Sequence, residues 1–306
     1  MGLHLRRSSI FWFAIFVLCF LLFFYNGTYK STFHSLVQSR NLPYFVPNRK
    51  IRSVTIASAL STNHFQEGLK FCKVFRSNAE LMNFRNLSLV IYNLGDLTDN
   101  HINQLEKACL IAKVKPFPFE KYPDYVKNIY EYRWKALAIK ESLEKSDVVF
   151  WTDGSTEFLT SNKTDDSFEN LINTVANSKI SMRLFGPSGH SIFWATDQRM
   201  YSFLNVSTEM AKRTEMFAAG IQLWVRTPFV MENVLKPWVN CALTKKCMGP
   251  KKAKLFCNPE NQTYGHCHRF DQSAINIILA NLANYDVSLY RTTLLCLRPI
   301  DYNKLR

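Results

Sequence analysis

The sequence predicts an α/β domain with a mixed, mostly parallel sheet flanked by helices. Apolar runs typical of strands alternate with amphipathic segments typical of helices between about residues 53 and 155, and this alternation is characteristic of parallel sheets covered on both faces. With 47% hydrophobic and 20% charged residues, the composition is that of a globular protein. Roughly 270 residues follow the apolar N-terminal segment, which is enough to bury one large core.

Each element follows from its local pattern. Continuous apolar runs predict buried strands, and apolar residues spaced three to four apart predict helices. The expected strands are 53–60, 87–93, 110–114, a strand within 147–155, an edge strand at 188–196 and a strand at 221–225. The expected helices are 65–82, 99–108, about 125–145 and 271–282. Two prolines, Pro116 and Pro118, are expected to end the third strand.

The N-terminus carries a candidate membrane anchor. Residues 8–29 contain no charge, and the apolar stretch within them is long enough for a thin bilayer. Arg6 and Arg7 precede this stretch, so the positive-inside rule keeps the N-terminus cytoplasmic. We expect a cytoplasmic tail at 1–9, a transmembrane signal anchor at 10–27, a stem at 28–50 and a lumenal domain at 51–306. The alternative is a cleaved signal peptide, which would put the same domain in the secretory lumen.

Glycosylation sequons and cysteines agree with a lumenal domain. Asn-x-Ser/Thr sequons occur at Asn26, Asn86, Asn162, Asn205 and Asn261. Four of the eight cysteines, Cys241, Cys247, Cys257 and Cys267, lie in one short basic stretch without the paired C-x-x-C spacing of zinc ribbons. We therefore expect two disulfides there, with a metal knot as the alternative. Cys72, Cys109 and Cys296 leave one odd thiol, either free or joining two chains.

The net charge of +14 indicates either many solvated lysines or an anionic ligand. A lumenal domain without an RNP-type aromatic pattern argues against nucleic acid as a partner. Nucleotide-sugars, sulfated glycans and anionic lipid head groups remain as partners.

The strand within 147–155 leads to the candidate site. It ends in Asp153-Gly154-Ser155, which places the Asp153 carboxylate at the carboxyl edge of a buried strand, where open α/β sheets bind ligands. The preceding helix sets Arg133 and Lys135 among aromatic residues, and cations there can meet a diphosphate. The alternative interpretations are an aspartate that caps a turn and basic residues that serve only solubility.

Three segments together resemble the GT-A-type glycosyltransferases: Trp-Thr-Asp-Gly-Ser at 151–155, the Ala-Ala-Gly strand start within 217–227, and His-Arg-Phe-Asp-Gln at the start of 268–276. More closely, residues 132–135, 150–155 and 267–276 resemble a nematode-expanded family of type II membrane proteins known mainly as a domain of unknown function. The resemblance covers about residues 50–300. It implies a GT-A-like fold and glycosyl transfer from a nucleotide-sugar to a glycan, lipid or protein hydroxyl, in the Golgi or endoplasmic reticulum.

The resemblance also implies a divalent metal at the site, but one of the residues expected to bind it is missing. GT-A enzymes end this strand with Asp-x-Asp, whose carboxylates hold Mn²⁺ or Mg²⁺ against the donor diphosphate. Asp153 matches the first Asp, but Ser155 stands in place of the second. The metal would then be held by Asp153 with a distant group such as His268 or Asp271, or be absent and replaced by Arg and Lys.

The same resemblance implies roles for the other site residues. Arg133 and Lys135 would face the phosphates, and Gly220 the donor sugar, because a side chain would clash there. Asp153 and Asp271 would be the catalytic pair, with Asp271 facing the acceptor, as the base if the reaction inverts. Structural alternatives are a glycine that opens a strand and an aspartate favoured by a helix dipole. The competing function, which the missing second Asp favours, is a catalytically inactive pseudoenzyme or a glycan-binding module.

Overall fold

The computed structural model describes residues 50–158, 167–258, 260–292 and 297–299. The predicted tail and anchor lie outside these residues, as do nearly all of the stem and the residues Asn26, Asn162 and Cys296. None of the helices in the described part has the length and apolar character that a bilayer span requires.

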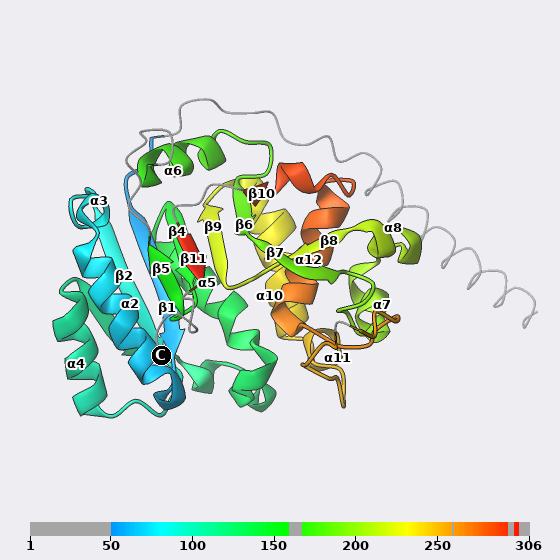
Figure 1. Ribbon diagram of the computed structural model, residues 1–306, viewed down its shortest axis with the longest axis horizontal. Coiled ribbons are helices and arrows are strands. Elements are labelled where there is room, and N and C mark those ends of the chain that lie inside the picture. The colour runs from blue at the N-terminus through cyan, green and yellow to red at the C-terminus, as the bar shows by residue number, and fades with distance from the viewer. Residues whose placement is uncertain (1–49, 159–166, 259, 293–296, 300–306) are drawn as a thin grey trace, which may run out of the picture. The chain divides into compact units, whose positions relative to one another are not determined.

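A seven-stranded sheet forms the centre of the domain, in the order β10-β6-β9-β4-β1-β2-β3 (Figure 1). Its strands are β1 (Val54–Leu60), β2 (Leu87–Asn93), β3 (Ala112–Pro116), β4 (Val148–Thr152), β6 (Met182–Phe185), β9 (Ile221–Val225) and β10 (Arg291–Thr292). Strand β9 runs antiparallel to β4 and β6, and the other neighbouring strands pair in parallel. The predicted mixed, mostly parallel sheet is therefore confirmed.

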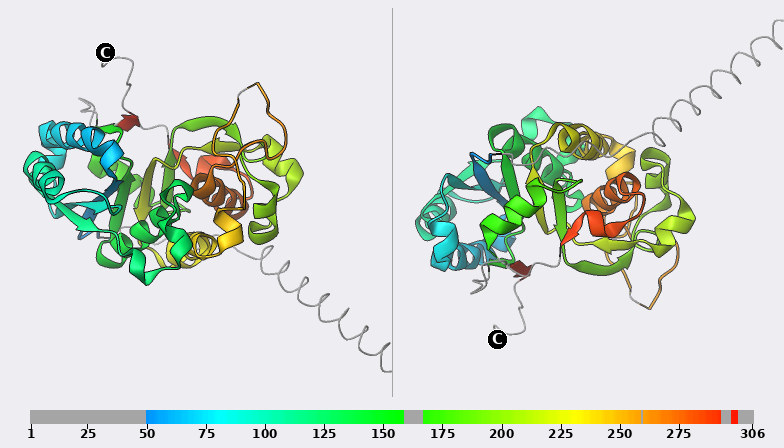
Figure 2. Two further views of the ribbon diagram at one scale, coloured as in Figure 1. Left: turned by 90° about the horizontal axis from the view of Figure 1, so that it is seen from below. Right: turned by 90° about the horizontal axis from the view of Figure 1, so that it is seen from above.

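Helices cover both faces of the sheet, and the layers can be followed in Figure 2. The first layer contains α2 (Phe65–Ser77), α4 (Asp99–Cys109) and α6 (Phe168–Ala176), and the second contains α5 (Arg133–Lys145), α10 (Lys236–Ala242) and α12 (Phe270–Leu282). Because side chains alternate along a strand, β4 serves both layers. Phe150 packs on Phe168 of α6 with ring centroids 5.3 Å apart, whereas Trp151 packs on Trp134 of α5 at 6.0 Å.

Shorter elements complete the domain. Strand β7 (Pro187–Ser191) pairs with β8 (Glu215–Phe217), and β5 (Thr156–Phe158) pairs with β11 (Leu297–Pro299). The short helices are α3 (Ala79–Met82), α7 (Tyr201–Leu204), α8 (Thr208–Arg213), α9 (Pro228–Val230) and α11 (Lys245–Met248), and a π-helical turn at Met231–Leu235 leads into α10.

Four predicted elements differ from the structure by two residues or more. The strand expected over 110–114 is β3 at Ala112–Pro116, because Leu110, with φ of 63°, ends α4. The helix expected from residue 125 begins only at Arg133, because Tyr132 adopts a left-handed backbone with φ of 53° after two 3-10 turns. The helix expected over 65–82 is interrupted at Asn78, whose extended backbone ends α2 and whose side chain caps α3 by accepting from the Leu81 N–H. The edge strand expected over 188–196 ends at Ser191.

Three disulfides form among the described residues. Cys241–Cys247 and Cys257–Cys267 confirm the prediction of two disulfides in the basic stretch. Cys72–Cys109 joins α2 to the end of α4. Two of the three cysteines with no predicted partner are thus bonded to each other.

Candidate functional site

The candidate site forms where β4 ends and β9 begins. Because these strands are antiparallel, Thr152 at the end of β4 lies opposite Ile221 at the start of β9. The residues just outside each strand therefore meet, and the Asp153 N–H donates a 2.7 Å hydrogen bond to the Gly220 carbonyl. The carboxyl edge predicted from the sequence is thus built by two segments nearly 70 residues apart in the chain.

Helix α12 holds the Gly220 segment in place. The Asn276 side chain accepts from the Phe217 N–H and donates to the Phe217 carbonyl, both at 2.8 Å. This amide satisfies both backbone groups of Phe217, the last residue of β8. Because Asp271 lies on the same helix, the Gly220 segment and the Asp271 carboxylate share one support.

Lys135 joins the two predicted catalytic aspartates. Its ammonium lies 3.1 Å from Asp153 Oδ1 and 3.2 Å from Asp271 Oδ2. It also donates to the Ala219 carbonyl at 3.3 Å. The Lys135 and Asp271 side chains are 4% and 6% exposed, whereas Asp153 is 41% exposed. Only Asp153 therefore offers much of its surface to a ligand.

Burial and charge act against each other in this cluster. Burial lowers the pKa of the Lys135 ammonium, but the carboxylates of Asp153 and Asp271 outweigh it, so the pKa is raised and the ammonium stays charged. Burial raises the pKa of the Asp271 carboxyl, Lys135 lowers it, and the net direction is upward. A raised carboxyl pKa suits a group that exchanges a proton.

Two aromatic residues with left-handed backbones lie at the starts of the helices that supply the charges. Tyr132, with φ of 53°, precedes α5 and Lys135, and Phe270, with φ of 41°, precedes Asp271. For residues with a large side chain this backbone costs roughly 1–3 kcal/mol and is common at functional sites. Burial and the Asp271 carboxylate raise the pKa of the Tyr132 hydroxyl, while Lys135 and Arg269 act against them. The Tyr132 hydroxyl therefore lies within the electrostatic influence of Asp271, Lys135 and Arg269.

Two cavities meet at Asp153. The larger, of about 380 Å³, is lined by Lys135, Gly220, Phe256, Arg269 and Gln272, among others. The smaller, of about 190 Å³, lies at the carboxyl end of β1 and is lined by Ser61, Asn63, His64 and Tyr130, among others. Tyr132, Asp153 and Ser155 line both. One carboxylate thus faces two adjoining spaces.

Gly220 is required by its closeness to Asp153. A Cβ at Gly220 would lie 2.9 Å from Asp153 Oδ2, a distance that real side chains avoid. A side chain at this position would therefore meet the Asp153 carboxylate, whereas the sequence predicted a clash with the donor sugar. Gly220 also lines the larger cavity, in agreement with its predicted place beside a donor sugar.

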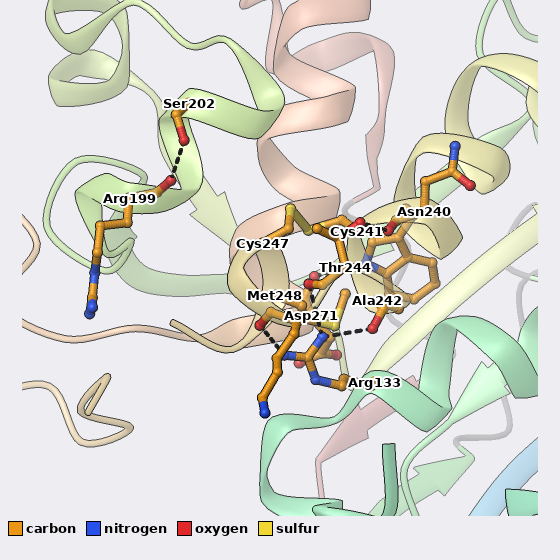
Figure 3. Close-up of a disulfide and its surroundings, with 12 residues drawn as sticks. Arg133, Arg199, Ser202, Asn240, Cys241, Ala242, Thr244, Cys247, Met248 and Asp271 are labelled. Atoms are coloured by element: carbon orange, nitrogen blue, oxygen red, sulfur yellow. Dashed lines mark hydrogen bonds between the residues drawn. A yellow bond between two sulfur atoms is a disulfide. The ribbon is translucent and has the colours of Figure 1, made fainter. Parts of the chain in front are cut away.

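Arg133 lies away from the predicted phosphate site, and that expectation is corrected. Its guanidinium is fully buried and donates to the carbonyl of Ala242 at 2.7 Å (Figure 3). It also donates to the carbonyl of Lys245 at 2.7 Å and to Glu131 at 2.5 Å. Residues two apart on a helix point roughly 200° apart. Arg133 and Lys135 therefore face opposite ways, and Arg133 stabilises the loop closed by the Cys241–Cys247 disulfide.

His268 is not placed to bind a metal with Asp153. Its Nδ1 accepts from the Asp197 N–H at 3.1 Å, and its Nε2–H donates to the Met248 carbonyl at 2.8 Å. Burial lowers the pKa of the imidazole to about 4. In the part of the chain that the structure describes, no three His, Cys, Asp or Glu side chains are arranged to hold a metal ion. The predicted metal pair of Asp153 and His268 is therefore not assembled, and Ser155 supplies no carboxylate.

Three residues of the larger cavity escaped the sequence analysis. Arg269 is half-buried there, next to the predicted Asp271. Gln272 is 6% exposed, and its buried side-chain nitrogen has no hydrogen-bond partner, which is costly unless a ligand or water satisfies it. Phe256 is 85% exposed. All three residues lie close in the sequence to Asp271 or to Cys257, and this closeness could have indicated that they belong to the site.

Comparisons with known proteins found one family model and a set of solved structures that are similar to the chain. A family model described as a protein of unknown function (DUF1647) matches residues 36–140. This agrees with the predicted resemblance to a domain of unknown function, whose expansion in nematodes stays a prediction. A search of curated protein sequences found no match.

Several solved glycosyltransferase structures are similar to the chain. A galactosyltransferase, LgtC, in complex with donor and acceptor sugar analogs is 13% identical, with 78% of this chain and 73% of that chain covered and a TM-score of 0.39. Mouse xyloside xylosyltransferase 1 is 10% identical, with 79% and 84% covered and a TM-score of 0.41. Core-mannan synthase A from Aspergillus fumigatus, in an Mn/GDP form, is 10% identical, with 83% and 74% covered and a TM-score of 0.41.

Proposed function

We propose that the chain is a glycosyltransferase that moves a sugar from a nucleotide-sugar donor to a hydroxyl of a glycan, lipid or protein. The observation that carries the proposal is the position of Asp153, at a strand end where two cavities meet, with Lys135 and Asp271 buried behind it. A nucleotide-sugar has two unlike parts, and the smaller cavity suits the nucleoside while the larger suits the sugar and its acceptor.

The residues suggest how transfer would proceed. The acceptor hydroxyl attacks the anomeric carbon of the donor sugar, the bond from that carbon to the phosphate oxygen breaks, and the nucleoside diphosphate leaves. Asp271, with its raised carboxyl pKa, would take the acceptor proton if the reaction inverts. Asp153 would accept hydrogen bonds from donor hydroxyls while holding Lys135, and Gly220 would leave room for the carboxylate.

Two substitutions test the proposal. A donor screen of the purified domain should show nucleotide release with at least one nucleotide-sugar. Asp153→Asn should abolish donor binding or turnover while keeping the fold, because the amide is isosteric at a partly exposed strand end. Asp271→Asn should not weaken nucleotide affinity but should reduce transfer about 10²–10⁴-fold, as expected for a lost proton acceptor. If both variants bind nucleotide like the parent and no donor is turned over, the enzyme proposal fails.

A pseudoenzyme or glycan-binding module is the second candidate. Ser155 in place of an acid favours it, and so does the exposed Phe256 ring beside the larger cavity, since aromatic faces pack well against sugar rings. Calorimetry separates the two functions, because a glycan-binding module should ignore nucleoside diphosphates.

We also propose that the chain is a single-pass type II protein of the Golgi or endoplasmic reticulum membrane, with this domain in the lumen. The apolar segment after Arg6 and Arg7, the five sequons and the three disulfides support this address. Glycosidase treatment should increase gel mobility. A C-terminal tag that proteases reach in intact microsomes would contradict this topology.

A further inference from the structure

The space between the two site carboxylates already holds a cation. A hard divalent cation such as Mg²⁺ binds about six oxygen ligands, and one or two of them are usually carboxylate oxygens of the protein. Here Asp153 Oδ1 and Asp271 Oδ2 are both within about 3 Å of the Lys135 ammonium, at 3.1 and 3.2 Å. The ammonium, 4% exposed, has nowhere to move without leaving a buried charge unpaired. A metal ion and this ammonium would therefore compete for the same two oxygens.

The charge of Lys135 alone does not neutralise the two carboxylates of the site. One ammonium against the carboxylates of Asp153 and Asp271 leaves one negative charge, which would repel a diphosphate. A divalent cation between two carboxylates would leave none. A metal-free site needs a second positive charge in the same cavity.

Arg269 supplies that second charge. It lines the larger cavity together with Lys135, Asp153 and Asp271. It forms no ion pair with a carboxylate among the residues that the structure describes. Its backbone N–H donates to the Ala195 carbonyl and to the Ser273 hydroxyl of α12, both at 3.1 Å. The Arg269 guanidinium is therefore available to bind an anionic ligand in this cavity.

We propose that Lys135 and Arg269 together replace the divalent cation of Asp-x-Asp sites, so that the donor diphosphate binds without a metal. This inference rests on the proposed glycosyl transfer. Lys135 neutralises the carboxylates, and the planar guanidinium of Arg269 binds phosphate oxygens in the forked geometry that arginine favours. As the sugar–phosphate bond breaks, the electron pair moves onto the phosphate oxygen, next to these two cations.

The test measures binding of uridine and guanosine diphosphates by calorimetry, with the intact lumenal domain in EDTA and again in Mn²⁺. Affinity should differ by less than about twofold between the two conditions. Arg269→Gln should weaken binding about tenfold to a hundredfold in both, the size of a lost charge-assisted contact, and Arg269→Lys should restore part of it. Arg76→Gln, which removes an exposed arginine from α2, is the matched control and should change nothing.

Lys135→Met gives an independent readout. With the ammonium gone, Asp153 and Asp271 should bind Mn²⁺ that the parent does not bind, measured by electron paramagnetic resonance without any nucleotide. If this variant does not fold, the diphosphate affinities of Arg269→Gln and Arg269→Lys still test the inference. Diphosphate binding that requires Mn²⁺ in the parent overturns the inference and leaves glycosyl transfer standing. If neither diphosphate binds under any condition, both this inference and the proposed glycosyl transfer are overturned.

Discussion

Arg133 is expected to maintain stability and to have no part in nucleotide binding. Its guanidinium is fully buried, and Arg133→Met would leave the carbonyls of Ala242 and Lys245 without their donor and Glu131 without its counter-charge. The Glu131 side chain is only 22% exposed, so water replaces little of what is lost. Removing one partner of such a buried pair costs about 3–5 kcal/mol.

This loss of unfolding free energy determines how far the melting temperature of Arg133→Met should fall. A domain of this size loses about 2–4 °C in melting temperature per kcal/mol. The melting temperature of Arg133→Met should therefore fall by roughly 6–20 °C. Arg76→Met, which removes an exposed arginine on α2, should stay within about 0.5 kcal/mol of the parent.

The same variant tests the corrected role. Below its melting temperature, Arg133→Met should bind nucleoside diphosphate with the parent's affinity, because Arg133 is not among the residues that line either cavity. A variant that melts like the parent yet loses nucleotide affinity would refute this reasoning and restore Arg133 as a phosphate ligand.

Three further outcomes are expected. Because burial holds the folded-state pKa of His268 at about 4, below the ordinary 6.5, protonation favours the unfolded chain as pH falls through this window. Urea denaturation should show about 2 kcal/mol less stability at pH 5 than at pH 7, and His268→Asn should remove this dependence. Gly220→Ala should reduce nucleotide release about tenfold or more, because its Cβ would displace the Asp153 carboxylate; full activity would contradict that clash. Replacing Cys72 and Cys109 together should cost about 4 kcal/mol in thermal unfolding, since they lie 37 residues apart, and an unchanged midpoint would show that the bond does not constrain the unfolded chain.

The sequence was sufficient where structure depends on neighbours in the chain. The bounds predicted for the strands at 87–93 and 221–225 match β2 and β9, because a continuous apolar run decides whether a segment is buried. The position of Asp153 at a strand end and the two disulfides of the basic stretch followed from local patterns as well. The break at Tyr132 was missed because a left-handed backbone leaves no trace in apolar spacing.

The tertiary structure decided which charged residues meet. Arg133 and Lys135 looked alike in the sequence, yet one is bonded to carbonyls more than 100 residues away and the other to Asp153 and Asp271. His268 has no free ring nitrogen because of contacts with distant backbone. A sequence pattern specifies the type of charge that a helix or strand presents. The partner that neutralises this charge depends on packing between elements far apart in the chain, where burial makes an unpaired charge too costly to leave.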